Sequence, residues 1–127
     1  FTMRDVAMTD SSLALIVEDD PDLAEIFSEA LRFGGFQVEA LGNGADALQR
    51  LKEIVPSVIV LDMHLPGASG VEILRQVRAD SRLETTRVIA STADARLAET
   101  LEDTADLVLV KPISFTQLRD LAVRLKR

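Results

Sequence analysis

Short apolar or alternating runs along the chain are separated by longer stretches in which apolar residues recur every three or four positions. The short runs predict strands at 13–17, 36–40, 58–61, 88–90 and 107–110. The longer stretches predict helices that begin near residues 21, 45, 70, 94 and 115. Strict alternation of strand and helix favours right-handed βαβ units, which build a parallel sheet with helices on both faces. The alternating pattern at 36–40 indicates a half-exposed strand at the sheet edge.

The third of these runs is the most informative, because its four apolar residues stop at a carboxylate, Asp62. An unbroken run of this kind is typical of a strand buried on both faces, in the middle of a parallel sheet. The turn sequence Leu65-Pro66-Gly67 follows it,. Open α/β sheets bind ligands at the carboxyl ends of their strands. We therefore expect Asp62 to lie at a functional edge.

Other polar side chains follow the first, fourth and fifth strands. Glu18 and Asp19 come after the first strand. Thr92 follows the fourth strand and Lys111 follows the fifth. Because carboxyl ends of parallel strands meet at one edge, we expect three acids, a hydroxyl and an ammonium group to converge. Crowded carboxylates call for a cation, and oxygen ligands favour Mg²⁺. The ammonium and hydroxyl suit phosphoryl oxygens, so the central carboxylate is the predicted nucleophile of an aspartyl phosphate.

Two neighbours compete with these assignments. Ser91 is adjacent to Thr92, but their side chains are expected to point in opposite directions, and we favour Thr92. Asp20 precedes Pro21, a pair typical of a helix N-cap and first turn, so we leave Asp20 outside the acidic site,.

Composition narrows the classes of function. The chain has 127 residues, enough for one domain, and a net charge of −7, which disfavours direct binding to nucleic acid or anionic lipid,. It has no cysteine, which excludes a disulfide framework and a thiol nucleophile,. We found no apolar run near the roughly 20 residues of a membrane span, and no signal-peptide centre in residues 1–12. We expect a cytoplasmic protein, with Phe1-Thr2-Met3 a tag remnant at the start of an N-terminal tail over 1–12.

Four motifs at strand ends carry a family resemblance. They are Ile-Val-Glu-Asp-Asp-Pro (16–21), Val-Leu-Asp-Met-His-Leu-Pro-Gly (60–67), Ser-Thr-Ala (91–93) and Val-Lys-Pro (110–112). Together they resemble the receiver domain of two-component response regulators, the family that includes the chemotaxis response regulator, over residues 13–127. The resemblance implies a flavodoxin-like, doubly wound α/β fold with strand order 2-1-3-4-5 and five helices.

The resemblance also implies a mechanism. Asp62 would accept a phosphoryl group from a histidine kinase or phosphotransfer protein, and Thr92 and Lys111 would bind its oxygens. The metal ligands for Mg²⁺ would be Asp19 directly, Glu18 through water, Asp62, and the backbone carbonyl of His64. Lysine followed by proline is often cis in this family. Phosphorylation would shift a population between two conformations that a downstream output protein or domain distinguishes, with no external substrate turned over.

The sequence departs from the family pattern at Val108, where an aromatic residue usually stands three positions before the lysine, and in a short fourth helix. A degenerate receiver acting as a phosphorylation-independent interaction module is the alternative. A phosphohydrolase is disfavoured because His64 occupies the place of its second acid, and a nucleotide carrier because no glycine-rich phosphate loop follows the first strand. The cognate kinase, the output partner, the oligomeric state (a homodimer included) and any larger parent protein stay open.

Overall fold

The computed structural model describes residues 12–125, which form a five-stranded parallel sheet in the order β2-β1-β3-β4-β5. The strands are β1 (Leu13–Val17), β2 (Gln37–Leu41), β3 (Val58–Asp62), β4 (Arg87–Thr92) and β5 (Leu107–Val110). The helices are α2 (Pro21–Phe33), α3 (Gly44–Leu51), α4 (Gly70–Ala79), α5 (Ala95–Leu101) and α6 (Phe115–Leu125), with a 3-10 turn, η1 (Ser81–Leu83). The predicted flavodoxin-like fold, strand order and five α-helices are confirmed for the described residues.

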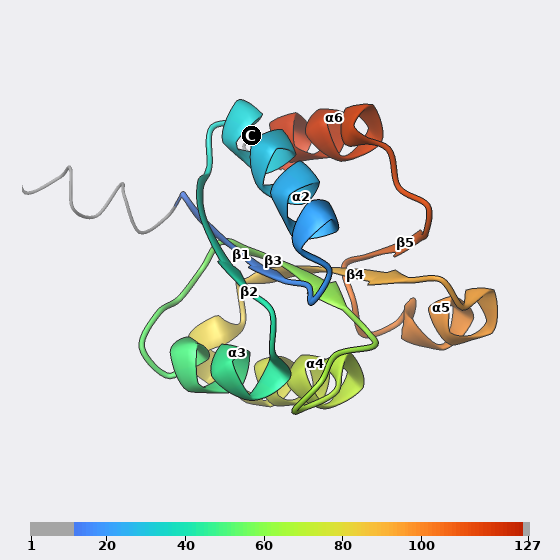
Figure 1. The fold of residues 1–127 in the computed structure, drawn as a ribbon. Coiled ribbons are helices and arrows are strands. Elements are labelled where there is room, and N and C mark those ends of the chain that lie inside the picture. The colour runs from blue at the N-terminus through green and yellow to red at the C-terminus, as the bar shows by residue number, and fades with distance from the viewer. Residues whose placement is uncertain (1–11, 126–127) are drawn as a thin grey trace, which may run out of the picture.

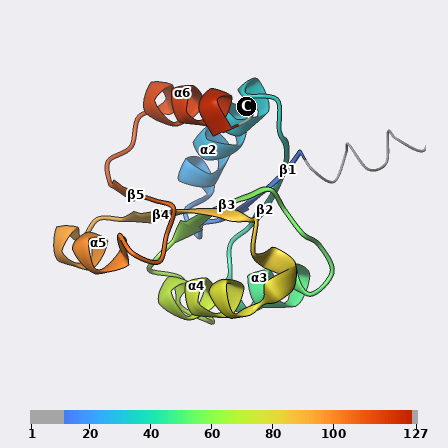
Figure 2. The same cartoon turned by 180° about the vertical axis from the view of Figure 1, so that it is seen from behind.

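Helices cover both faces of the sheet (Figures 1 and 2). Helices α2 and α6 lie on one face, and α3, α4 and α5 lie on the other. The two central strands supply both layers in alternation: Leu15 and Ile59 pack on the α3–α5 side, whereas Ile16 and Val60 pack on the α2–α6 side. Burying each such side chain contributes about 1.5–3 kcal/mol. Strand β3 is buried along its whole length, as predicted, so its carboxyl end is held firmly in place.

The ends of α2 follow local chemistry. The side chain of Asp20 accepts hydrogen bonds from the N–H groups of Asp22 and Leu23, which makes it the N-cap of α2,. At the other end α2 stops at Gly34, and Gly35 has φ +100°, a left-handed conformation that glycine adopts without strain,. This helix therefore begins where the sequence predicts.

The boundaries of three strands differ from the prediction, and one element is new. Strand β3 includes Asp62, which pairs with Ser91 of β4. Strand β2 begins at Gln37 because the N–H of Phe36 donates to the carbonyl of Leu31, closing the end of α2 (3.0 Å), and is lost to the sheet. Strand β4 extends to Thr92 because it pairs with β3 and with β5. The η1 turn was not predicted. The edge position of β2 is confirmed.

The predicted N-terminal tail lies outside the described residues except for Ser12, which stands directly before β1. Within residues 12–125, none of the helices has both the length and the apolar character that crossing a bilayer requires.

Candidate functional site

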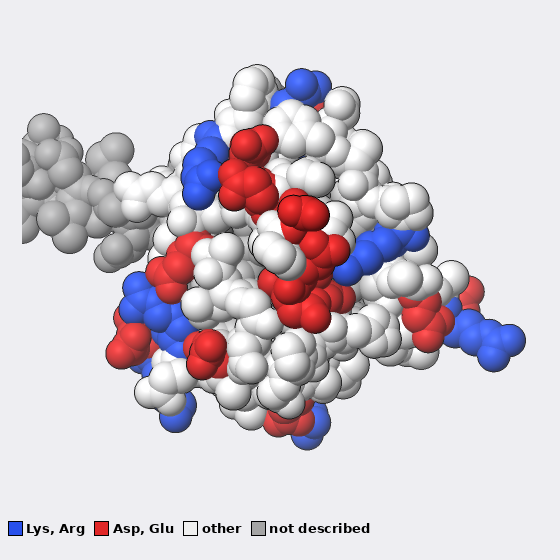
Figure 3. All heavy atoms as spheres, viewed as in Figure 1, with Lys and Arg blue, Asp and Glu red and all other residues white. Residues whose placement is uncertain are grey.

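Three acidic side chains converge at the carboxyl edge of the sheet. Glu18 and Asp19 follow β1, and Asp62 ends β3, whose register with β1 places the two strand ends side by side. One carboxylate oxygen from each residue lies within 4.8 Å of the others. Glu18 and Asp62 are 3% and 4% exposed, whereas Asp19 is exposed. Figure 3 shows acidic atoms gathered in the middle of this face, with basic atoms beside them.

Lys111 reaches this cluster from the end of β5. Its Nζ lies 3.2 Å from Oε1 of Glu18 and 3.5 Å from Oδ1 of Asp62. The peptide bond from Lys111 to Pro112 is cis, as the family resemblance implied. The predicted neighbourhood of Lys111 and Asp62 is therefore present, and the closer ion pair of Lys111 with Glu18 was not anticipated.

Burial and neighbouring charges shift the pKa of both partners. Burial raises the pKa of Glu18 and the charge of Asp62 adds to this, outweighing the N–H of Asp20 and the contact with Lys111,. Partial burial lowers the pKa of Lys111, but its hydrogen bond and charge interaction with Glu18 and the charge of Asp62 outweigh that effect and raise it. Glu18 therefore keeps its proton to a higher pH than an ordinary glutamate, and Lys111 keeps its proton to a higher pH than an ordinary lysine.

Thr92 and His64 meet at the other side of the site. Thr92 is fully buried, and its Oγ1 lies 3.2 Å from Nε2 of His64 and accepts the N–H of Asp94 at 3.0 Å. The backbone N–H of His64 donates to Oδ1 of Asp62 at 3.2 Å. Sequence reasoning gave the His64 side chain no firm role, because the 28 positions that separate it from Thr92 leave no local pattern to detect.

The competing residues behave differently. The Oγ of Ser91 is buried and makes no hydrogen bond with any described residue. The carboxylate of Asp20 caps α2 and stays outside the acidic group, as predicted, although its backbone N–H donates to Oε2 of Glu18.

The donor set suits a divalent cation. Three carboxylates offer oxygen ligands close enough to share one ion, and the sequence supplies no thiolate,. Three negative charges against the one ammonium of Lys111 leave two uncompensated when all are ionised. A hard cation such as Mg²⁺ would balance them, so the residues present fit this metal.

Comparisons with known proteins agree with the geometry. Residues 14–123 match the family described as the response regulator receiver domain. "DNA-binding response regulator MtrA" of Mycolicibacterium smegmatis is 36% identical over 104 residues, which make up 82% of this chain and 46% of that protein. The chain therefore spans about half the length of the curated relatives it matches.

Solved structures show the same fold. A putative response regulator from Chloroflexus aurantiacus has a TM-score of 0.82 at 28% identity, with 92% of this chain and 99% of that chain covered. The receiver domain of sensor histidine kinase PA1611 from Pseudomonas aeruginosa has a TM-score of 0.79 at 25% identity, with 92% and 99% covered. That receiver has a magnesium ion coordinated in its active-site cleft.

Proposed function

This chain belongs to the response regulator receiver domain family, and we propose that it accepts a phosphoryl group on Asp62 from a histidine kinase or phosphotransfer protein. The observation that carries the proposal is the placement of Asp62. Its buried carboxylate lies at the end of the central strand, within 3.5 Å of an ammonium and beside two further acids.

The transfer needs few groups. A carboxylate oxygen of Asp62 forms a bond to phosphorus, the bond from phosphorus to the donor imidazole nitrogen breaks, and its electron pair stays on that nitrogen. Lys111 lies where it would neutralise a phosphoryl oxygen, and Thr92 would donate its hydroxyl proton to another. The chain acts on its own carboxylate and turns over no external substrate.

The acids have a second role in this proposal. Glu18, Asp19 and Asp62, with the backbone carbonyl of His64, would hold Mg²⁺. Bound there, the metal would neutralise charge on the phosphoryl oxygens. The oxygen-only donor set and the magnesium ion coordinated in the Pseudomonas receiver support this assignment.

The relatives suggest where the signal goes. Several are named as DNA-binding or transcriptional regulators, and this chain corresponds to about half of each. We infer that the chain controls an output domain or partner protein by a shift between two conformations. Direct contact with nucleic acid would then be made outside this chain, consistent with its charge of −7,.

The test is direct labelling. Incubation with acetyl phosphate and Mg²⁺ is expected to add the mass of one phosphoryl group to the wild-type protein. Asp62→Asn removes the nucleophile and should abolish the gain, whereas Asp20→Asn, a matched acid outside the cluster, should keep it. An unlabelled wild-type protein, or a labelled Asp62→Asn variant, would contradict the proposal.

The alternative is a degenerate receiver that binds its partner regardless of phosphorylation. One observation favours it: Val108 is an aliphatic residue packed against the core cluster on the α3–α5 side, where the family usually has an aromatic residue. Amide spectra with and without Mg²⁺ and beryllofluoride, a phosphoryl mimic, distinguish the two. Shifts confined to the residues around Asp62 would support the alternative.

A further inference from the structure

A continuous chain of hydrogen bonds leads from Asp62 to the start of α5. Oδ1 of Asp62 accepts the backbone N–H of His64, whose Nε2 lies 3.2 Å from Oγ1 of Thr92. The same Oγ1 accepts the N–H of Asp94. The carboxylate of Asp94 in turn accepts the N–H groups of Arg96 and Leu97 as the N-cap of α5.

The Thr92 hydroxyl fixes the direction of the central bond. A hydroxyl has one proton to donate, and the N–H of Asp94 already occupies one of its lone pairs,. Thr92 is fully buried, so its proton needs an acceptor within the protein,. The acceptor that the described contacts provide is Nε2 of His64, which requires the imidazole to carry its proton on Nδ1,.

We propose that His64 is a positioning residue: its imidazole holds the Thr92 hydroxyl in the unphosphorylated state and couples phosphorylation of Asp62 to the N-cap of α5. This inference rests on the function proposed above. When a phosphoryl oxygen takes the Thr92 proton, Nε2 of His64 loses its partner. Movement of Thr92 then disturbs its bond with the Asp94 N–H, and the first turn of α5 shifts.

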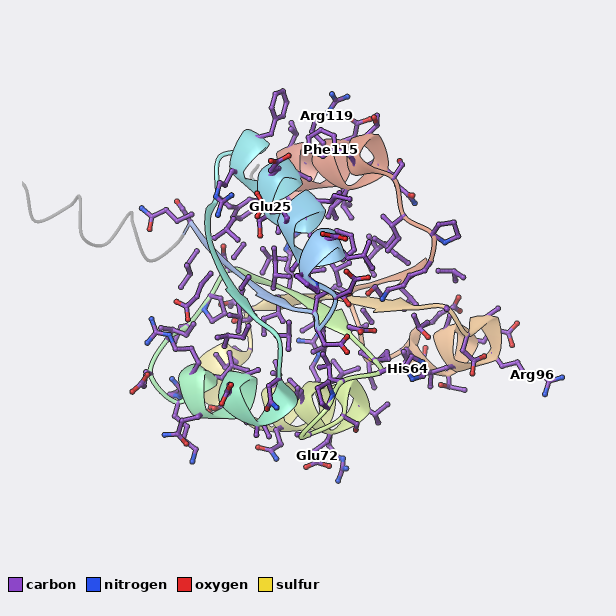
Figure 4. All side chains as sticks on the ribbon, in the orientation of Figure 1. Glu25, His64, Glu72, Arg96, Phe115 and Arg119 are labelled. Atoms are coloured by element: carbon purple, nitrogen blue, oxygen red, sulfur yellow. The ribbon has the colours of Figure 1, made fainter. Side chains whose placement is uncertain are left out.

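Two features make α5 the element that responds. It is the shortest α-helix among the described residues, with seven residues and only Ala98 and Leu101 buried in it. The second feature is Val108, which packs against the same core cluster as Leu101 of α5. Most family members have an aromatic residue at this position, but valine has no ring that could rotate into the space that Thr92 vacates. Figure 4 shows the side chain of His64 between α4 and α5. The coupling therefore runs through the loop after β3.

Amide spectra test the route. In the wild-type protein, Mg²⁺ and beryllofluoride should shift the amide signals of Asp94, Arg96 and Leu97. In His64→Ala, an exposed position, those signals should already lie part of the way to their shifted positions without any mimic. Labelling by acetyl phosphate should be faster by between about twofold and tenfold, since one hydrogen bond no longer has to break. His64→Gln, which keeps an acceptor, should stay near wild type.

A double-mutant cycle distinguishes loss of the hydrogen bond between His64 and Thr92 from other effects of the His64 substitution on the loop after β3. In a Thr92→Val background, His64→Ala should change neither the α5 amide signals nor the labelling rate. Ser91→Ala, which removes the adjacent buried hydroxyl, should leave the effect of His64→Ala intact. Equal effects of His64→Ala with and without the Thr92 hydroxyl would overturn the inference, as would wild-type α5 signals in His64→Ala. Absence of labelling in the wild-type protein would instead contradict the proposed function itself.

Discussion

At the scale of single residues, Glu18 makes the site sensitive to pH. Its pKa in the folded protein is raised, mainly by burial, so the folded state keeps this proton to a higher pH than the unfolded chain does. The unfolded carboxyl ionises around its ordinary pKa of 4.5. As pH rises above that value the unfolded state gains charge first, and the contribution of Glu18 to the free energy of unfolding falls until the folded carboxyl has also ionised.

In the absence of metal, we therefore expect the free energy of unfolding of the wild type to fall relative to that of Glu18→Gln as pH rises above about 4.5. Denaturant unfolding of both proteins at a series of pH values measures this difference. Because both proteins contain the other carboxylates, the contributions of those groups to the pH dependence cancel in this difference. A difference independent of pH would show that Glu18 titrates alike in the folded and unfolded states.

Gly70 is the residue whose missing side chain lets α4 start against the end of β3. A Cβ at this position would collide with the carbonyl oxygen of Asp62 and would lie 2.6 Å from Cα of Met63. Gly70→Ala is expected to lower the free energy of unfolding by about 1–3 kcal/mol through overpacking. It should also weaken Mg²⁺ binding, because the strand end that carries Asp62 must shift.

Gly42→Ala is the matched control. A Cβ there would meet the carbonyl oxygen of Glu18 at an ordinary 3.6 Å. That variant should be as stable as the wild type, or gain up to about 1 kcal/mol from a stiffer unfolded chain. Equal stabilities of the two alanine variants in urea unfolding would contradict the close packing at Gly70.

At the scale of elements, hydrophobic period and cap chemistry were enough to predict nearly every helix and strand. The failures occur where a backbone group has a partner far away in sequence or outside its own element. Phe36 suits a strand by its alternation, but its N–H is taken by Leu31. Strand β4 extends beyond its apolar run because Ser91 and Thr92 pair with neighbouring strands. The η1 turn has no apolar period of its own, and its start depends on the Asp80 side chain, which accepts the N–H of Arg82.

The site follows the same rule. The convergence of Asp62, Lys111 and Thr92 follows from strand order, because each ends or follows a strand of one parallel sheet. The contact between the side chains of His64 and Thr92 does not follow, since it depends on the path of a loop and on a rotamer. Strand-end residues are thus predictable from pattern, and loop side chains require the fold.

Helix α5 should be less stable than α4. It has two buried residues, whereas α4 has four in ten, and local unfolding is easiest where few apolar contacts break,. Amide hydrogen exchange of the unphosphorylated protein should therefore be faster in α5 than in α4. Equal protection of the two helices would mean that contacts with β4 and β5 hold α5 as firmly as the core holds α4.

At the scale of the whole molecule, two apolar layers position a site whose clustered charges destabilise the fold. The layers on either side of the sheet fix the ends of β1, β3 and β5, and those ends carry three acids and one lysine to the same place. Within a chain of net charge −7, this edge concentrates like charges that repel,. The charge cluster therefore lowers the stability of the fold, and a cation bound there should restore it.

Mg²⁺ should accordingly stabilise the folded protein. A ligand bound only by the folded state at a hundred times its dissociation constant adds about 2.7 kcal/mol, which raises Tm by several degrees in a domain of this size. Thermal unfolding of the unphosphorylated protein with increasing MgCl₂, against NaCl of matched ionic strength, measures the effect. Asp19→Asn removes one ligand and should abolish most of the rise, whereas Asp22→Asn, an exposed aspartate three positions along, should preserve it. An equal rise in both variants would mean that Mg²⁺ acts by screening surface charge, and the acidic cluster would lose its assignment as the metal site.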